Sequence, residues 1–350
     1  MTVHQLRAGR IHVGDWMRAD LQPGYTLAIV DGPYAMGIAP WDRMKVDDLA
    51  DWYAPHLARV SALLAPSASV YLWNTAAGWA RIDPVMRGLG WTFRALVTWD
   101  KGYSKEIMGK DAMRTWPDVT EVCGFYQREP SEVDLWNQRG ERHPVRLYLD
   151  AARERAGMSN ADVDAALGVQ GMARHWFTWT QWCLPSPARY AQLRAIMPGL
   201  DRDLDDLRAE HQRLWTDFRA EWERARAPFN PPMATTNVWS APVVAGPERL
   251  KSDMGTALHP CQKPLAFAER MIRASTRPGE RVLVPFGGTC REAVVCEWLS
   301  RTEPEEARGY DVCELNADGR DYIGPVLAQI RGEATGPRAP GQVRMFGGGE

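Results

Sequence analysis

The sequence predicts an α/β fold, a sheet with helices on both faces, interrupted by an all-helical insert. In about the first 130 residues, short apolar runs of strand length alternate with longer runs of helical periodicity. From about residue 131 to 226 only helical patterns occur, and after the proline-rich stretch 228–232 the strand–helix alternation resumes. Such alternation is typical of a sheet covered on both faces. Each α/β piece alone holds too few strands for a doubly wound sheet, so we expect the two pieces to share one.

The apolar runs divide the chain into expected elements. In the first α/β piece we expect strands at 26–30, 69–73, 92–99 and 120–126 and helices at 46–64 and 79–89. In the second we expect helices at 265–275 and 292–299 and strands at 281–284 and 307–312. The expected domains are a first α/β half at 1–130, a helical insert at 131–232, a second α/β half at 233–331 and a tail at 332–350. The Gly, Pro and Arg content of the tail predicts disorder.

The composition narrows the class of protein. Hydrophobic content of 45% and charged content of 25% over 350 residues are ordinary for a soluble chain, and no apolar run has the ~18 residues of a membrane span. The N-terminus lacks a signal-peptide core, so we expect a cytoplasmic protein, bacterial or phage-encoded. Six scattered cysteines without a Cys-x-x-Cys pair indicate a reduced compartment and no metal site. A net charge of −2 argues against coating nucleic acid by bulk charge.

Four residues with complementary chemistry follow the first apolar run. Asp31, Gly32, Pro33 and Tyr34 come directly after 25–30, which we interpret as a buried strand. An acid, a bare carbonyl, a rigid proline and an aromatic side chain at the carboxyl end of a strand can hold an extruded nucleobase by its exocyclic amine. A Gly-Pro pair after a strand is by itself a turn signal, so these residues need support from elsewhere in the chain.

A glycine-rich turn near the other end of the chain indicates a nucleotide-like ligand. The turn 286–289, Phe-Gly-Gly-Thr, lies between an expected strand and an expected helix, where backbone can approach a ligand closely. Asp311 ends the next apolar strand about 20 residues later, where an acid can accept hydrogen bonds from both hydroxyls of a ribose.

The order of three motifs carries a family resemblance. The chain has Asp-Gly-Pro-Tyr at 31–34, His-Pro-Cys-Gln-Lys-Pro at 259–264 and Val-Pro-Phe-Gly-Gly-Thr at 284–289. In this order they resemble the motifs of the amino-DNA methyltransferases: Asp-Pro-Pro-Tyr, His-Pro-x-Gln-Lys-Pro and Asp-Pro-Phe-x-Gly-Ser-Gly. The likeness covers about residues 11–127 and 237–322. It implies a permuted, Rossmann-like methyltransferase sheet that binds S-adenosylmethionine.

The resemblance also implies a set of cofactor-binding residues. They are Asp15, His259, Gln262, Lys263, Pro285, Phe286, Gly287, Gly288, Thr289 and Asp311. Within this set, Phe286 and Gly288 would line the methionine side of the cofactor. Asp311 would bind the ribose, and Asp15 would face the adenine. Lys263, with its neighbours at 259 and 262, would close the amino-acid end and could pair with the cofactor's carboxylate.

The chain departs from the family pattern at three positions. Val284 stands where the family usually has Asp, and Cys290 where it usually has Gly or Thr. Loss of the acid at 284 removes an expected partner for the ammonium group of the cofactor. Gly32 replaces the usual proline, which keeps the carbonyl but relaxes the backbone.

The resemblance assigns the chemistry to Asp31 and its neighbours. Two acceptors that grip the two N–H bonds of an exocyclic amine would return the delocalised lone pair to the nitrogen. Asp31 and the carbonyl of Gly32 are the expected acceptors, Pro33 holds the turn and Tyr34 offers a stacking face. Trp41 and Trp99 are candidates to wall the base. The acid at the first motif position is commoner for adenine targets, whereas cytosine enzymes more often carry serine.

The helical insert carries a second resemblance. Ser159 and Asp162 are placed as a capping box at the start of a helix over 160–167, and Gly168-Val169 makes a turn before a second helix expected over 170–176. This pattern looks like the helix-turn-helix of the lambda-repressor type, whose second helix enters the major groove of DNA. The candidate DNA contacts are Gln170, Arg174 and His175.

These observations predict a site-specific methyltransferase that acts on double-stranded DNA as a monomer or homodimer. It would transfer a methyl group to adenine N6 in preference to cytosine N4, on a flipped base. One alternative is a DNA-binding regulator with a catalytically impaired methyltransferase core, which Val284 and Cys290 favour and which Asp31 and Tyr34 oppose. A second is a methyltransferase that acts on glutamine amides or RNA, which the helix-turn-helix pattern disfavours.

Overall fold

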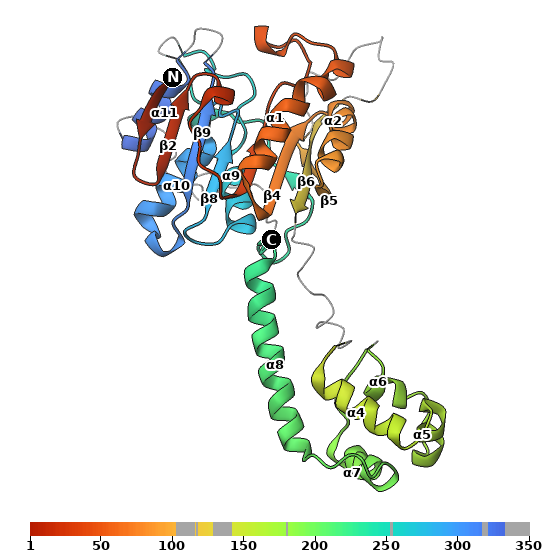
Figure 1. The fold of residues 1–350 in the computed structure, drawn as a ribbon. Helices are drawn as coiled ribbons and strands as arrows, with labels where there is room; N and C mark the ends of the chain where they lie inside the picture. Colours follow the sequence, from red (N-terminus) through yellow and green to blue (C-terminus); the bar gives the residue numbers. More distant parts are fainter. Residues whose placement is uncertain are drawn as a thin grey trace, which may run out of the picture. The chain divides into compact units, whose positions relative to one another are not determined.

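The structure is a computed structural model that describes residues 1–102, 116, 118–128, 142–179, 181–252, 255–316 and 321–332. Contacts divide the chain into an α/β unit, residues 1–129 with 227–350, and a helical unit, residues 130–226 (Figure 1). From residue 333 onward, the expected disordered tail lies outside the described residues. None of the helices described is long and apolar enough to span a bilayer.

The described part of the α/β unit contains one nine-stranded sheet. Its strands in spatial order are β1 (Thr2–Gln5), β2 (Gly9–Val13), β9 (Gly309–Glu314), β8 (Arg281–Val284), β3 (Tyr25–Val30), β4 (Leu64–Asn74), β6 (Thr120–Arg128), β5 (Thr92–Asp100) and β7 (Val238–Ser240). The run from β2 to β4 is parallel, whereas β1 and β6 are antiparallel to their neighbours. β8 and β9, from the C-terminal piece, lie between β2 and β3 (Figure 1), so the prediction of one shared sheet is confirmed.

Helices cover both faces of this sheet. They are α1 (Leu49–Leu63), α2 (Ala76–Gly88), α9 (Leu265–Ser275), α10 (Arg291–Thr302) and α11 (Ile323–Arg331). The last three form one core with Leu27 and Ile29 of β3, and the first two form another with Ala28 and Val30. Since successive residues of a strand face opposite sides, β3 buries apolar side chains in both cores. Its continuous apolar sequence is therefore that of a central parallel strand.

The expected elements agree with the structure where the local pattern is strong. The helix at 265–275 and the strand at 281–284 begin and end as predicted. The strand β2 was missed because Arg10 and His12 interrupt its apolar pattern. Both side chains contact the neighbouring strand β9: Nε of Arg10 donates to Asp311 at 2.7 Å, and Nε2 of His12 lies 2.7 Å from the same oxygen.

The helical unit has its own apolar core. Its helices are α4 (Pro144–Arg155), α5 (Asn160–Leu167), α6 (Ala173–Phe177), α7 (Pro187–Ile196) and α8 (Leu204–Ala225). Leu149, Val163, Trp176, Leu193 and Leu207, one from each helix, are buried together. The predicted capping box is present: Ser159 Oγ accepts from the backbone N–H of Asp162, and the Asp162 carboxylate accepts from the backbone N–H of Ser159.

Two boundaries of the insert differ from the sequence-based expectation. The helix expected over 170–176 begins only at Ala173, because the Asp164 carboxylate accepts from the N–H groups of Gly171 and Ala173, both at 2.8 Å, and holds a turn there. Residues 227–232 belong to the α/β unit, not to the insert. Phe229 lies 5.1 Å from the ring of Phe125, and this packing ties the linker to the sheet.

Candidate active site

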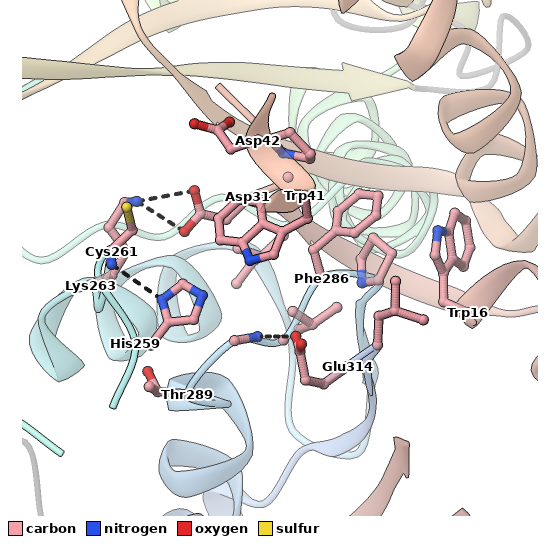
Figure 2. A pocket seen from close by; sticks show the side chains of 18 of the residues that line it. Trp16, Asp31, Trp41, Asp42, His259, Cys261, Lys263, Phe286, Thr289 and Glu314 are labelled. Atoms are coloured by element: carbon pink, nitrogen blue, oxygen red, sulfur yellow. Dashed lines mark hydrogen bonds and ion pairs between the residues drawn. The ribbon is translucent and has the colours of Figure 1, made fainter. Parts of the chain in front are cut away.

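A cavity of about 280 Å³ lies at the carboxyl ends of β3, β8 and β9 (Figure 2). The turn 31–34 follows β3, the loop 285–289 follows β8, and Glu314 is the last residue of β9; all of them line the cavity. The three strands are parallel neighbours, so their carboxyl ends meet at one edge of the sheet. Two motifs about 250 residues apart in the sequence are thereby joined in one site.

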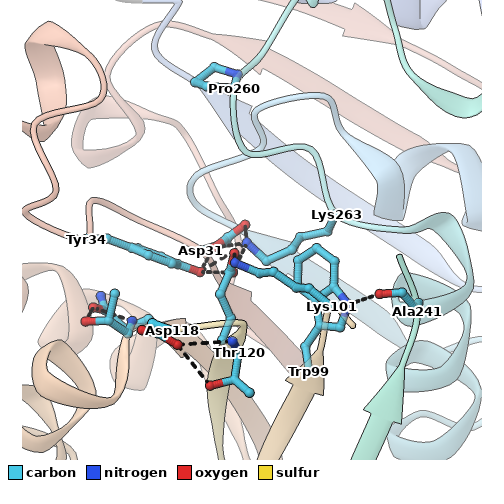
Figure 3. Close-up of polar contacts among 12 residues, drawn as sticks. Asp31, Tyr34, Trp99, Lys101, Asp118, Thr120, Ala241, Pro260 and Lys263 are labelled. Carbon is cyan, nitrogen blue, oxygen red and sulfur yellow. Dashed lines mark hydrogen bonds and ion pairs between the residues drawn. The ribbon is translucent and has the colours of Figure 1, made fainter. Parts of the chain in front are cut away.

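Asp31 is held at the cavity wall by two donors (Figure 3). Nζ of Lys263 lies 3.0 Å from its Oδ1 and 2.9 Å from its Oδ2, and the hydroxyl of Tyr34 donates to Oδ1 at 2.7 Å. Among the residues described, Oδ2 therefore has a single donor. Because each oxygen of a carboxylate accepts about two hydrogen bonds, Oδ2 retains capacity for a further N–H.

Lys263 lines the cavity and is paired inside the protein, so its contact with a cofactor carboxylate stays a prediction. Its side chain is 8% exposed, and Nζ also lies 3.0 Å from Oε2 of Glu121, whose other oxygen pairs with Lys101 at 2.7 Å. Burial acts to lower the pKa of Lys263, but the carboxylates of Asp31 and Glu121 outweigh burial and hold that pKa above its ordinary value. Lys263 is thus a fixed cation that orients Asp31.

Tyr34 lines the cavity but is only 7% exposed, so the stacking face expected of it is mostly buried. Burial and the nearby Asp31 carboxylate raise the pKa of Tyr34 well above its ordinary value, so its hydroxyl stays protonated and donates to Asp31. The turn after it is held by Asp42, whose carboxylate accepts from the N–H groups of Tyr34, Ala35 and Met36 at 2.7, 2.8 and 2.9 Å.

Close packing around position 32 explains why the chain has a glycine there. A Cβ placed on Gly32 would lie 2.7 Å from Oη of Tyr53 and 3.2 Å from the ring of Phe286. The next carbonyl, of Pro33, accepts from Tyr53 and Asn74 at 3.1 and 3.2 Å. In the described part of the chain, no donor contacts the carbonyl of Gly32, which leaves it available to a ligand.

Gly32→Ala is expected to lower kcat/KM for methyl transfer about 10- to 100-fold, since the turn must shift to clear Tyr53 and a displacement near 1 Å misplaces Asp31. The double variant Gly32→Ala/Tyr53→Phe removes the closest atom and should recover part of the loss. Steady-state kinetics, with thermal unfolding as a check on folding, measure both effects. Full activity in the single variant would show that the close approach of Gly32 is unnecessary.

The loop after β8 also requires glycine. A Cβ on Gly287 would lie 2.5 Å from the side chain of Val312, and Gly288 has a φ of +49°. The N–H of Gly287 donates to the carbonyl of Cys313 at 2.7 Å, so the loop lies against β9. Cys290 has a φ of +47°, in the left-handed region, at the position where the family usually has Gly or Thr.

Glu314, and not Asp311, is the acid at the carboxyl end of β9. It lines the cavity, and its carboxylate accepts from the N–H of Gly288 at 2.6 Å and of Asn316 at 2.9 Å. The signal for Glu314 was present in the sequence, an acid at the end of an apolar strand, but the predicted strand ended two residues too early, at 312 instead of 314.

The assignment of Asp311 to a ribose is corrected. Asp311 is 2% exposed and does not line the cavity. Its carboxylate accepts from Arg10 and Tyr25 at 2.7 and 2.8 Å and from Arg281 at 2.8 Å, and lies 2.7 Å from Nε2 of His12. Burial acts to raise the pKa of Asp311, but these four donors outweigh burial and hold that pKa well below its ordinary value. Asp311 joins strands of the sheet.

Aromatic side chains form one end of the cavity. Trp16, Trp52, His56 and Phe286 all line it, and the ring of Phe286 lies 5.5 to 6.0 Å from the other three. The indole N–H of Trp16 donates to Nδ1 of His56 at 3.0 Å. Asp15 lines the same end and caps the short helix that carries Trp16. A planar, apolar ligand with a polar edge fits this end.

Some residues of the 259–264 motif line the cavity, and others hold the loop beside it. His259 lines the cavity and stacks on Trp41, with ring centroids 5.8 Å apart (Figure 2). Gln262, which was expected to contact the cofactor, lies outside the cavity. Its amide donates to the carbonyl of Glu248 at 2.7 Å and accepts from the N–H of Leu250 at 2.9 Å, so it holds the adjacent loop. The cofactor assignment of Gln262 is therefore corrected.

The remaining candidates from the sequence are Trp99 in the α/β unit and three residues of the helical unit. Trp99 is buried against Phe267 and does not line the cavity. Gln170 and Arg174 are exposed on the helical unit, and His175 is half-buried. Lining residues that were not candidates from the sequence are Gly14, Trp16, Ile29, Ile38, Asp42, Trp52, His56, Cys261, Arg291, Glu292, Glu314 and Leu315. Most are aromatic or charged residues whose local sequence has the pattern of an ordinary helix or turn.

Comparison with protein families gives one match that spans most of the chain. The model of an N6/N4 methyltransferase family described as DNA methylase matches residues 25–325. Among curated proteins, the type II methyltransferase M1.MboII of Moraxella bovis is 21% identical over 305 residues, which are 87% of this chain and 89% of that protein. The type II methyltransferase M.HinfI of Haemophilus influenzae is 37% identical over 65 residues, 19% of this chain and 18% of that protein.

Solved structures with a related arrangement are more distant in sequence. The M1.HpyAVI–SAM complex matches with a TM-score of 0.45 and 15% identity, covering 92% of this chain and 99% of that one. The cytosine-N4-specific PvuII DNA methyltransferase matches with a TM-score of 0.48 and 11% identity, covering 92% of this chain and 86% of that one.

Proposed function

We propose that this chain, which belongs to the N6/N4 DNA methylase family and is an S-adenosylmethionine-dependent DNA amino-methyltransferase, methylates adenine N6 at a specific sequence in double-stranded DNA. The observation that carries the proposal is the cavity itself. It joins the acceptor turn at Asp31 to the glycine-rich loop at 286–289, so a methyl donor on the loop and an amine at the turn would meet in one space.

The residues present fit S-adenosylmethionine. Gly287 lies against Val312 and Gly288 has a positive φ, so the loop brings bare backbone to the cavity, and the aromatic end around Phe286 suits an adenine ring. In place of Asp311, we propose that Glu314 accepts from the ribose hydroxyls. His259 lines the cavity near Gly288, and its ring would lie 3.5 Å from a Cβ atom placed on that glycine. His259 would border the methionine moiety. When bound, the cofactor supplies an electrophilic methyl group on its sulfonium.

The protein would then act by positioning the target amine. Oδ2 of Asp31 would accept one N–H and the carbonyl of Gly32 the other, so the lone pair of the nitrogen would turn toward the methyl group. Lys263 and Tyr34 hold the Asp31 carboxylate in place and leave Oδ2 room for this bond. After transfer, Asp31 is the nearest carboxylate to receive the proton that the methylated nitrogen releases. Because transfer is an in-line displacement, positioning and exclusion of water supply most of the catalysis.

We propose adenine as the target base because position 31 carries an acid. We propose that the base is flipped because Asp31 lies inside the cavity. An amine can reach Oδ2 of Asp31 only from within the cavity, so the base must leave the duplex stack. Tyr34 offers little area for stacking at 7% exposure, and Trp41, which lines the cavity beside His259, offers a further aromatic face.

The proposal is tested by sequencing DNA, with modification detection, from cells that express the protein and otherwise lack methylation. N6-methyladenine confined to one short sequence is expected, and none with the Asp31→Ala variant. Methylation at cytosine N4 would overturn the choice of base. Unmodified DNA despite DNA binding would favour the impaired regulator, an alternative that the intact Asp31 site does not favour.

We further propose that the helical unit selects the DNA sequence. Arg174 is exposed on α6, the helix after the turn, and guanidinium groups read base edges bidentately. The later start of α6 places Gln170 in the turn and makes it a contact from the turn, not from the helix. His175 is half-buried, with Nδ1 3.3 Å from the carbonyl of Gln181, and is the weaker candidate.

Arg174→Ala is expected to relax the site preference at one base pair, since one base-edge contact contributes about 1–3 kcal/mol of discrimination. Total methylation of saturating DNA should change little. Arg194→Ala, which removes an exposed arginine from α7 of the same unit, is the matched control and should keep the preference. The sequence logo of methylated sites measures both variants. An unchanged logo for Arg174→Ala would place recognition elsewhere.

A further inference from the structure

The cavity contains a buried carboxyl group that the proposed mechanism leaves unused. Glu292 is the second residue of α10, lines the cavity and is 8% exposed. In the described part of the chain, no other residue donates a hydrogen bond to its carboxylate or forms an ion pair with it, and its donor is its own backbone N–H. Arg291 beside it donates to the carbonyl of Thr289 at 2.8 Å and to Gln329 at 3.1 Å, and does not form a direct ion pair with Glu292.

A buried carboxyl group with so few donors is energetically costly in its charged form. Burial and, to a smaller extent, the negative charge of Asp31 raise the pKa of Glu292 to about 7, although its own backbone N–H acts to lower that pKa. Lys263 and Arg291 act in the opposite direction, but Lys263 is already shared between Asp31 and Glu121. A positively charged ligand group beside Glu292 would remove this cost.

Other carboxylates that line the cavity already have donors. Asp31 is bonded by Lys263 and Tyr34, Asp42 by backbone N–H groups, and Glu314 by the N–H groups of Gly288 and Asn316. Asp15 accepts from the N–H of Met17 and is about half exposed. Glu292 is therefore the buried acid in the described lining that a ligand cation can satisfy.

The position of Val284 supports a role for Glu292 in binding a cationic group of the ligand. Val284, which stands where an acid was expected to meet the ammonium group of the cofactor, lines the same cavity and is 2% exposed. The apolar side chain of Val284 cannot pair with that ammonium group, whereas Glu292 supplies a carboxylate to the same cavity from the first turn of α10.

We propose that Glu292 binds the α-ammonium group of S-adenosylmethionine, and so takes over the charge complementarity that Val284 lacks. This inference rests on the cofactor of the proposed function. The ammonium donates to the Glu292 carboxylate, which is ionised when the cofactor is bound. Glu292 is a positioning residue for the methionine end and takes no part in the transfer itself.

The direct test compares two ligands by calorimetric titration of the full chain. S-adenosylhomocysteine carries the ammonium group, whereas 5′-methylthioadenosine keeps the adenine, ribose and sulfur but lacks the amino acid. Glu292→Gln should weaken S-adenosylhomocysteine about tenfold or more, the loss expected for one charged hydrogen bond. Binding of 5′-methylthioadenosine should stay within about twofold, because Glu292 does not reach the nucleoside. Glu292→Asp should bind S-adenosylhomocysteine better than Glu292→Gln does.

The outcomes separate the inference from the proposed function. Equal losses for both ligands would mean that Glu292→Gln disturbs the whole site, and no loss for either would mean that Glu292 is not a ligand; both overturn the inference. If the wild-type protein bound neither ligand, the proposed function itself would fail. Glutamine has the shape of glutamate without its charge, so the variant should fold, and thermal unfolding confirms this.

The pH dependence gives a second, independent measurement. Charged or titratable groups around Glu292 are Asp31, Lys263, Cys290, Arg291 and Cys296, with His56, His259 and Glu314 also lining the cavity. Because only ionised Glu292 binds the ammonium, wild-type affinity for S-adenosylhomocysteine should fall about tenfold from pH 8 to pH 6. Glu292→Gln should lack this fall, which separates Glu292 from the histidines. An affinity that rises toward pH 6 would instead mean that protonated Glu292 donates to the ligand's carboxylate, and the inference would be wrong.

Discussion

Asp31→Ala is expected to reduce methyl transfer by at least about three orders of magnitude, because the variant loses both the acceptor that positions the amine and the group that receives its proton. Binding of S-adenosylhomocysteine should change less than about threefold, since the proposed contacts to the cofactor come from other loops of the cavity. Single-turnover kinetics with DNA at saturation and calorimetric titration measure the two effects separately.

The variant should remain folded because Lys263 keeps its second carboxylate partner, Glu121, 3.0 Å away. Asp51→Ala, which removes an exposed aspartate from α1, is the matched control and should keep full activity. Asp31→Asn keeps one acceptor oxygen but loses the charge, and should fall between the wild type and Asp31→Ala. Undiminished turnover in Asp31→Ala would exclude Asp31 from the mechanism.

Glu314→Ala is expected to lose affinity for the cofactor, whereas Asp311→Ala is expected to lose stability. Glu314→Ala removes up to two charged hydrogen bonds to the ribose, about 1.5–3 kcal/mol each, so affinity for S-adenosylmethionine should fall about tenfold at the least. Asp311→Ala removes a buried carboxylate from four donors and leaves Arg10 and Arg281 without it, which should cost about 3–5 kcal/mol of the free energy of unfolding. Titration calorimetry and thermal unfolding of both variants make the comparison.

The pH dependence of unfolding separates the two acids further. The pKa of Asp311 is held well below its ordinary value, so its stabilisation is present above the unfolded pKa of about 4 and is lost as the pH falls below it. The wild type should therefore exceed Asp311→Ala in stability at pH 7 and lose that advantage in strong acid. If Asp311→Ala unfolded like the wild type but bound no cofactor, the original assignment of the ribose to Asp311 would be right after all.

Gln262 and Lys263 illustrate how far the sequence predicts the site. The 259–264 motif predicted that this segment lies at the site, and His259 and Lys263 do line the cavity. Its side chains were expected to meet the ligand together. In the structure, the amide of Gln262 bonds the backbone at 248 and 250, while Lys263 pairs with Asp31 and Glu121. A motif predicts the place of a segment, but each side chain bonds to whatever partner the other segments bring near it.

The sequence by itself determined the elements whose patterns are local. The apolar run of β3, the helix at 265–275, the strand at 281–284 and the two turns that follow strands can all be recognised without knowledge of any contact. Period, turn chemistry and capping act within a few residues, so these features are written into the chain where they occur.

Only the tertiary structure decided which polar side chains face the cavity. Asp311 and Glu314 lie three residues apart on one strand, yet Asp311 is surrounded by donors from β2, β3 and β8, whereas Glu314 stands at the open edge of the sheet. The same holds for Glu292, whose local sequence is that of an ordinary helix start. Whether a charged group is satisfied by the protein or left for a ligand depends on neighbours that are distant in sequence, because a buried charge needs a partner from whichever strand or helix packs against it.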